Sequence, residues 1–165
     1  ITYVVFRLSK KPHLKLEYGE IRAEMTRQGL VTETLTPLQL RQIIIAVRAR
    51  KLPDPRTLPN VGSFFKNPVI TTQHLHSLQA TWPAIVHYPV DEVRVKVAAG
   101  WLIDQLGWKG RTQGRARVHE QQALVLINLG GSSDDLLALA RQIQDSVRER
   151  FGIELEAEPL MIGLA

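Results

Sequence analysis

Residues 58–70, with the sequence LPNVGSFFKNPVI, bring core-forming and chemically active side chains close together. A hydroxyl (Ser63), an amine (Lys66) and an amide (Asn67) stand beside two adjacent phenylalanines. A buried strand does not accommodate an unpaired lysine and asparagine, and a surface turn does not use two phenylalanines. Taken alone, Ser63 is typical of a turn, so the segment has to be interpreted together with the rest of the chain.

The residues before this segment predict a strand and then a helix. Residues 1–8 are rich in β-branched and aromatic side chains, which indicates a strand. Thr36 and Gln39 form the pattern of a capping box with Pro37 at the first helical position, so a helix is expected to begin here. The prolines of LPDP at 52–55 cannot continue that helix, and this break is the best candidate for a domain boundary.

The residues after the segment predict further helices and strands. Helical spacing of apolar residues predicts helices at 73–80, at 91–106 and from Ser132 to about residue 147. The apolar run ALVLIN at 123–128 indicates a central strand, and the strict alternation of GIELEAEPLMIG at 152–163 indicates a final one. Loops are expected at 82–89 and 107–114. This order of elements predicts a fold of the α+β class.

Composition excludes several classes of protein. The chain contains no cysteine, so disulfides and thiolate chemistry are excluded, which agrees with a cytoplasmic location. No apolar run approaches the ~20 residues that span a bilayer, so no membrane association is expected. The first residues carry neither an initiator methionine nor a signal-peptide pattern, and we expect the chain to be the C-terminal part of a longer protein.

The charge of the chain allows two kinds of anionic partner. Its net charge is +5 and its pI about 9.8, which attracts nucleic acids and anionic small molecules such as nucleotide sugars alike. The basic residues do not form an arginine-aromatic stripe, and only 6% of residues are aromatic, which argues against RNA recognition by base stacking. A non-catalytic module that binds RNA or another polyanion remains the alternative at this point.

Standard catalytic and metal-binding motifs do not match. His74 and His76 are two apart on a predicted helix and point to different sides, so no metal site is expected. The serine lacks the nucleophile-elbow pattern of hydrolases, and the glycine clusters match no nucleotide-binding loop. Each remaining candidate has an ordinary structural explanation: a solvated strand face (Glu154, Glu156 and Glu158), a helix C-terminus (Lys51) and a surface aromatic (Tyr88).

Several blocks of the sequence, taken together, resemble the C-terminal half of the UDP-N-acetylenolpyruvoylglucosamine reductases, flavoenzymes of peptidoglycan precursor synthesis. The blocks are KLPDP (51–55), GSFFKNP (62–68), VRVKVAAGWLIDQLGWKG (93–110), VHEQQALVLIN (118–128) and FGIELEAEP (151–159). HYP at 87–89 resembles the subtype with a tyrosine-bearing loop. The resemblance implies a substrate-binding α/β sandwich at 53–150, a return strand at 151–165 with the catalytic glutamate, and at 1–52 the tail of an FAD-binding α+β domain.

The resemblance also implies a reaction. In this family NADPH reduces FAD, the flavin passes a hydride to C3 of the enolpyruvyl ether of UDP-N-acetylglucosamine, and the resulting C2 enolate is protonated. The family's proton donor corresponds to Ser63, and its second catalytic group, a glutamate, corresponds to Glu158. Serine is a weak acid, so the site has to stabilise the alkoxide that forms when the proton leaves.

The family's substrate-binding residues fall on Lys51, Asn67, Tyr88 and Gln122. Lys51 is implied to give a point charge to the diphosphate, Asn67 and Gln122 directed hydrogen bonds, and Tyr88 a lid. Phe64 and Phe65 would then anchor the segment in the core and hold the polar side chains beside them in place.

The chain departs from the family in two ways. Pro159 and Leu160 stand where a valine and an arginine are usual. The glycine-rich FAD-binding segments, the catalytic arginine and one substrate-binding tyrosine of the family's N-terminal half have no counterpart here. The chain by itself is therefore expected to bind FAD weakly and to need that half as a partner for turnover. Folding only as an oligomer or with that half is a further alternative.

Overall fold

The computed structural model describes residues 1–17 and 19–162. The chain divides into two compact units, Ile1–Leu52 and Pro53–Ala165, so that the division falls within the LPDP stretch. Residues 151–162 belong to the second unit, and the last residues of the segment predicted at 151–165 lie outside the described part of the chain.

Within its described residues, the first unit contains two helices and a short 3-10 turn: α1 (Ile21–Arg27), η1 (Thr32–Thr34) and α2 (Pro37–Lys51). The predicted capping box is present, since the Thr36 hydroxyl accepts from the Gln39 N–H and the Gln39 amide oxygen accepts from the Thr36 N–H. α1 packs against α2 over a small core. Its buried side chains are Leu16, Ile21, Met25, Leu35, Ile43 and Val47.

The strand predicted at 1–8 is wrong. These residues have no regular secondary structure, and their apolar side chains, from Ile1 to Leu8, are exposed. A strand needs a neighbour to take up its backbone hydrogen bonds, and within the described residues this segment pairs with none.

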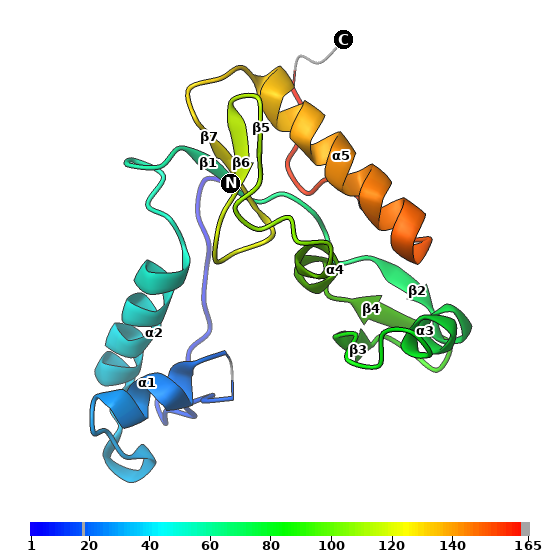
Figure 1. Ribbon diagram of the computed structural model, residues 1–165. Coiled ribbons are helices and arrows are strands. Elements are labelled where there is room, and N and C mark those ends of the chain that lie inside the picture. Colours follow the sequence, from blue (N-terminus) through cyan, green and yellow to red (C-terminus); the bar gives the residue numbers. More distant parts are fainter. Residues whose placement is uncertain (18, 163–165) are drawn as a thin grey trace. The chain divides into compact units, whose positions relative to one another are not determined.

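The second unit contains two antiparallel sheets (Figure 1). The larger sheet has the order β1-β7-β6-β5, and the smaller has the order β2-β4-β3. The strands of the larger are β1 (Asn60–Ser63), β7 (Val125–Asn128), β6 (Ala116–Val118) and β5 (Thr112–Gln113). Those of the smaller are β2 (Val69–Thr71), β4 (Arg94–Val97) and β3 (His87–Pro89). The central strand predicted from ALVLIN is confirmed as β7.

Three helices complete this unit: α3 (Thr72–Gln79), α4 (Ala99–Gln105) and α5 (Ser133–Phe151). α5 lies along the larger sheet (Figure 1), and its Leu139, Ile143 and Val147 are buried in the core of this unit. α3 packs against β2 and β4 of the smaller sheet. Helices packed on antiparallel sheets make this an α+β fold, as the order of elements predicted.

The helix predicted at 91–106 is correct only from Ala99 onward. Residues 94–97 form β4 instead, with Val95 and Val97 buried and Arg94 and Lys96 exposed. Valines in this segment satisfy both helical spacing and strict alternation, and β-branched side chains favour the strand.

Two predicted loops contain strands, and the predicted final strand is mostly irregular. His87–Pro89 forms β3, an edge strand that tolerates a proline, and the glycine-rich loop carries the β5–β6 hairpin. The segment predicted as a strand at 152–163 makes one isolated bridge, Phe65 with Ala157. It keeps the predicted alternation, since Ile153 and Leu155 are buried between exposed glutamates.

Candidate active site

Ser63 is the last residue of β1 and is exposed. Asn60 pairs with Ile127 and Ser63 with Val125, so β1 carries one extra residue, a bulge. Gly62, just before the serine, has φ +66°, and the Asn60 amide oxygen accepts from the Gly62 N–H at 3.0 Å. A left-handed glycine is the residue that such a bulge requires, and it sets the direction in which the chain enters Ser63.

The two residues after the serine hold it to the core. Phe64 and Phe65 are 4% and 1% exposed, and their rings meet edge to face with centroids 5.0 Å apart. The Phe64 N–H donates to the Leu124 carbonyl at 2.8 Å, which continues the pairing of β1 with β7. The predicted burial of both phenylalanines in the core is confirmed.

Glu158 forms a backbone hydrogen bond with the same segment. Its backbone N–H donates to the Phe64 carbonyl at 2.8 Å, and the Lys66 N–H donates to the Glu156 carbonyl at 2.9 Å. With the bridge between Phe65 and Ala157, these bonds pair 64–66 with 156–158 in antiparallel fashion. Glu158 is thus joined through backbone to the residue that follows Ser63.

The three alternating glutamates at the end of the chain differ in their neighbours. The Glu154 carboxylate lies 3.8 Å from the Arg148 guanidinium, and the Glu156 carboxylate forms an ion pair with Lys66. Glu158 is exposed, and its backbone N–H bonds to Phe64, the residue next to Ser63, whereas the Glu156 carbonyl bonds to Lys66 further along the segment. The alternation alone could not distinguish them, because all three point to the same side.

Gln122 is half-buried in the turn that leads into β7. Its carbonyl accepts from the Val125 N–H at 3.0 Å, and the turn is closed by a bond from the His119 N–H to the Val125 carbonyl at 2.9 Å. Since Val125 is the register partner of Ser63, Gln122 lies on the strand connection next to the serine.

Asn67 links the serine segment to helix α4. Its side-chain oxygen accepts from the Ala99 N–H at 2.9 Å, although the helix's own N-cap residue, Ala98, makes no side-chain cap. This bond takes up a backbone donor at the helix start and fixes the plane of the Asn67 amide. The amide NH₂ is the group of Asn67 that could donate to a ligand.

Tyr88 lies on β3 and is 55% exposed. It pairs with Lys96 of β4, and Lys96 pairs in turn with Val69 of β2. Side chains of directly opposed residues share one face of a sheet, so Lys96 lies between Tyr88 and Val69. Lys96 is a candidate cation that sequence reasoning missed; the alternation of Arg94, Val95, Lys96 and Val97 was the signal that could have indicated it.

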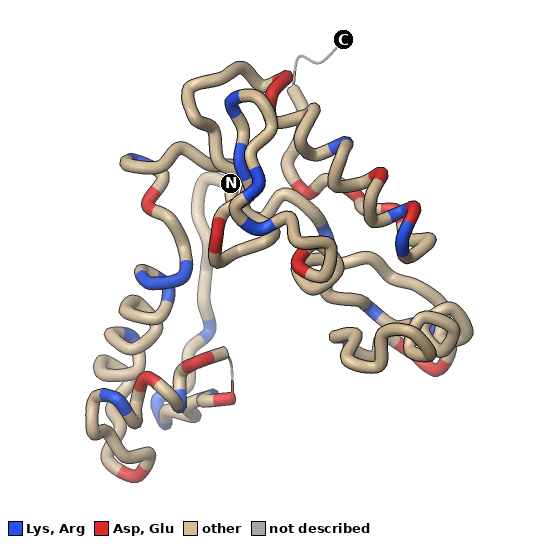
Figure 2. Tube along the Cα trace, in the orientation of Figure 1, with Lys and Arg blue, Asp and Glu red and all other residues tan. Residues whose placement is uncertain are grey.

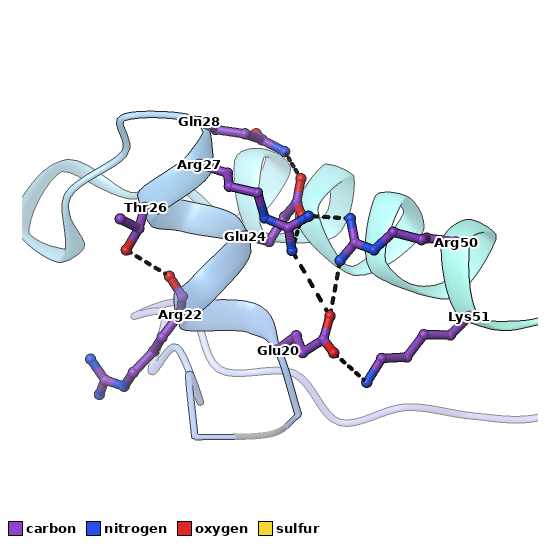
Figure 3. A network of polar contacts seen from close by, with 8 residues as sticks. All are labelled: Glu20, Arg22, Glu24, Thr26, Arg27, Gln28, Arg50 and Lys51. Atoms are coloured by element: carbon purple, nitrogen blue, oxygen red, sulfur yellow. Dashed lines mark hydrogen bonds and ion pairs between the residues drawn. The ribbon is translucent and has the colours of Figure 1, made fainter. Parts of the chain in front are cut away.

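Lys51 is the last residue of α2 and belongs to the first unit. Its ammonium lies 3.2 Å from the Glu20 carboxylate, within a network that includes Glu24, Arg27 and Arg50 (Figure 3). Hydrogen bonds from Lys51 and then Arg50 hold the pKa of the Glu20 carboxyl below its usual value. A hydrogen bond from Gln28, followed by one from Arg50, lowers the pKa of the Glu24 carboxyl.

Basic residues gather at two places along the chain (Figure 2). One is the last turn of α2, with Arg48, Arg50 and Lys51, and the other is the β5–β6 region, with Arg111, Arg115 and Arg117. Within residues 1–17 and 19–162, no group of three acidic or histidine side chains could hold a metal ion. No helix in the described part of the chain is long and apolar enough to cross a membrane.

Five of the residues that the resemblance singled out belong to the second unit, and several of them are connected by backbone hydrogen bonds. Glu158 bonds through its backbone to Phe64, which follows Ser63, and Gln122 bonds to Val125, the register partner of Ser63. Asn67 follows on the same segment, and Tyr88 lies on the sheet into which that segment continues. An exposed hydroxyl, a carboxylate and amide groups on an α+β scaffold are suited to hydrogen bonding with a polar ligand and to proton transfer.

The fold defines this part of the chain as an α+β domain with two antiparallel sheets. The family model described as UDP-N-acetylenolpyruvoylglucosamine reductase, C-terminal domain, matches residues 54–162. The chain belongs to this family.

Similar proteins agree with this assignment. The chain is 51% identical over 163 residues to the UDP-N-acetylenolpyruvoylglucosamine reductase of Burkholderia vietnamiensis. This alignment covers 98% of this chain and 47% of that protein. It is 48% identical to the enzyme of the same name from Bacteroides fragilis, over 96% of this chain and 47% of that protein. The chain spans about half the length of the curated relatives that it matches.

A solved structure is also similar. The crystal structure of the UDP-N-acetylenolpyruvylglucosamine reductase of Thermus caldophilus aligns with a TM-score of 0.42 and 26% identity. The alignment covers 73% of this chain and 33% of that one.

Proposed function

We propose that this chain supplies the substrate-binding and proton-donating part of a reductase that converts the enolpyruvyl ether of UDP-N-acetylglucosamine to UDP-N-acetylmuramate. The observation that carries the proposal is the antiparallel pairing of 64–66 with 156–158, because it brings Glu158 to the segment that ends β1 at Ser63. The family assignment supplies the reaction class.

Ser63 is proposed as the proton donor to C2 of the enolate. A serine hydroxyl is a poor acid in water, so its proton can be given up only where neighbouring groups stabilise the alkoxide. Glu158, joined to Phe64, is proposed to polarise the carboxyl end of the substrate and to assist protonation. The bulge at Gly62 and the two buried phenylalanines support this role, since they fix the backbone of Ser63 on both sides.

Four further residues are proposed to bind the nucleotide sugar. Asn67 and Gln122 would donate hydrogen bonds from their amides, and Tyr88 would contact the diphosphate from β3. Lys51, in the first unit, would contribute a point charge to the phosphates. Lys96 is a second candidate for such a charge, because it lies beside Tyr88 on the exposed face of the smaller sheet.

FAD and NADPH are proposed as the redox cofactors, with FAD supplying the hydride when bound. Within the described residues of the first unit, the helix starts do not fit a flavin diphosphate. α1 begins after the acidic Glu20, and the Thr36 hydroxyl already caps α2. FAD is therefore proposed to be held mainly by the N-terminal part of the relatives, which this chain does not span. A cytoplasmic location and roles in cell shape and division would follow from peptidoglycan precursor synthesis.

Calorimetric titration of the chain with UDP-N-acetylglucosamine enolpyruvate tests the binding half of the proposal. Saturable binding that weakens in Asn67→Ala, with little affinity for FAD, is the expected result. Absence of binding by a folded chain would overturn the assignment of an autonomous substrate domain.

Protonation is tested in a complete reductase in which this chain supplies the C-terminal half. Ser63→Ala should leave reduction of FAD by NADPH intact and abolish formation of UDP-N-acetylmuramate. Unchanged product formation would contradict the proton-donor role. Binding of RNA or another polyanion in place of the nucleotide sugar would favour a non-catalytic module.

A further inference from the structure

Lys51 is tied to the interior of the first unit by a relay of ion pairs (Figure 3). The relay begins at Glu24, whose side chain is 9% exposed. One oxygen of Glu24 accepts from the Gln28 amide at 2.8 Å, and the other meets the guanidinium groups of Arg27 at 3.0 Å and Arg50 at 2.8 Å. A buried carboxylate with this many donors has a fixed orientation, and so has the guanidinium of Arg50 that pairs with it.

The second half of the relay is centred on the Glu20 carboxylate, which pairs closely with Arg50 and Lys51 and lies 3.9 Å from Arg27. Arg50 donates from its other terminal nitrogen to Glu20 Oε2 at 3.0 Å, while Lys51 Nζ lies 3.2 Å from Glu20 Oε1. Arg50 thus holds Glu20, and Glu20 holds Lys51. Glu20 immediately precedes α1 and Lys51 ends α2, so the relay also follows the packing of these two helices.

The network of Glu20, Glu24, Arg27, Arg50 and Lys51 carries a net positive charge that can attract an anion. Three cations, Arg27, Arg50 and Lys51, face the two carboxylates of Glu20 and Glu24, which leaves one positive charge in excess. An ammonium has three N–H donors, and Glu20 engages Lys51 on one side only. A flexible lysine whose position is fixed loses less conformational entropy when it meets a ligand.

We infer that Glu20 is a positioning residue for Lys51: it holds the ammonium in place for an anionic diphosphate while leaving donors free to bind it. The inference rests on the proposed function, since it concerns the ligand assigned to Lys51 there. The opposite effect is the alternative to be tested, in which Glu20 competes with the anion for Lys51 and its removal strengthens binding.

A double-mutant cycle on the full chain separates these effects. The variants are Glu20→Ala, Lys51→Ala and the double variant, each titrated calorimetrically with UDP-N-acetylglucosamine enolpyruvate. Glu20→Ala should raise Kd about two- to fivefold, the range that corresponds to the coupling of partly exposed ion pairs. In the Lys51→Ala background the same substitution should have no effect, because Glu20 acts through Lys51.

Glu17→Ala is the matched control for loss of negative charge. Glu17 is an exposed glutamate of the same unit that pairs with Arg22 at 2.9 Å. Its removal should leave Kd unchanged or lower it slightly. A Glu20→Ala variant that binds as tightly as the parent or more tightly, or a loss that persists without Lys51, would overturn the inference.

A measurement without ligand distinguishes failure of the inference from failure of the proposed function. The side-chain ammonium signal of Lys51 in a ¹H–¹⁵N NMR spectrum, assigned by its absence in Lys51→Ala, should be visible in the parent and in Glu17→Ala and be lost in Glu20→Ala. A signal that is unaffected by Glu20→Ala would show that Glu20 does not hold Lys51. A parent that shows the signal but binds no nucleotide sugar would overturn the assignment of an autonomous substrate domain and with it the purpose assigned to Glu20.

Discussion

The two units hold their candidate residues by different forces. In the second unit, Ser63 and Glu158 are positioned by backbone hydrogen bonds on either side of Phe64, a residue buried in the core. In the first unit, Lys51 is positioned by side-chain ion pairs through Glu20. Backbone bonds and apolar burial do not depend on pH or salt near neutrality, whereas partly exposed ion pairs depend on both.

This difference suits the two tasks that we propose for these residues. Proton transfer requires a donor held within a fraction of an ångström, which a paired backbone on a packed core provides. Binding of a diphosphate by a lysine depends mainly on charge, so an adjustable ion pair is sufficient. The comparison predicts that substitutions in the second unit act through stability and geometry, and those in the first through electrostatics.

Loss of the core anchor should have the largest effect. Phe65 is 1% exposed, so Phe65→Ala leaves a cavity beneath the segment that carries Ser63 and is expected to lower the free energy of unfolding by about 3–5 kcal/mol. Urea denaturation measures this loss. Phe6→Ala is the control, since Phe6 is 76% exposed and its removal should change stability by less than about 0.5 kcal/mol.

The bulge before Ser63 should be the next most sensitive feature. Gly62 has φ +66° and open space around the position of a Cβ, so Gly62→Ala adds backbone strain without a steric clash. A loss of about 1–2 kcal/mol is expected from urea denaturation. Gly100→Ala is the matched control: Gly100 lies within α4, and its Cβ would make an ordinary contact with Leu124 at 3.5 Å. It should be neutral or stabilising, and an equal loss in both variants would contradict the role of the bulge.

Some parts of the structure could be predicted from the sequence and others could not. The capping box of Thr36 and Gln39 was predictable, because it depends on residues three apart, and so was the apolar strand at 123–128. The burial of Phe64 and Phe65 followed from their chemistry. The division of 91–106 into β4 and α4 was not predictable from spacing, since the valines fit both periods and the choice depends on pairing with β2 and β3.

Long-range contacts were beyond the reach of local patterns. Nothing near Asn67 in sequence indicates that it accepts a hydrogen bond from Ala99, and nothing near Lys51 indicates Glu20. The position of Tyr88 on a strand depends on β4, its only partner among the described strands. The resemblance to a family could name the candidate residues, but the contacts that orient them appear only in three dimensions.

Asn67 allows capping and ligand binding to be separated. Asn67→Ala leaves the Ala99 N–H without its acceptor and should lower the free energy of unfolding by about 0.5–2 kcal/mol. Asn67→Asp keeps an acceptor for this N–H but removes the amide donor, so stability should be retained while affinity for the nucleotide sugar falls. Urea denaturation and calorimetry measure the two effects. Full affinity in Asn67→Asp would show that the amide donor is not used.

The pH dependence of the Glu20 ion pairs should be the smallest effect and the one that most sharply separates the two units. Lys51 and Arg50 hold the folded-state pKa of Glu20 below its ordinary value of 4.5, so the unfolded chain takes up a proton first as pH falls. Stabilisation by Glu20 is therefore fully present above about pH 4.5 and is lost as pH falls through the lower folded-state pKa. The difference in Tm between the parent and Glu20→Ala should be constant from pH 7 to 5 and shrink below pH 4.5, and 1 M salt at pH 7 should reduce it.

Asn67→Ala is the control for this pH scan. Its difference in Tm from the parent should stay the same over the same pH range, because its bond to Ala99 involves no titrating group. A Glu20 difference that ignored both pH and salt would mean that this glutamate supports the first unit by packing, and the contrast between the two units would fail.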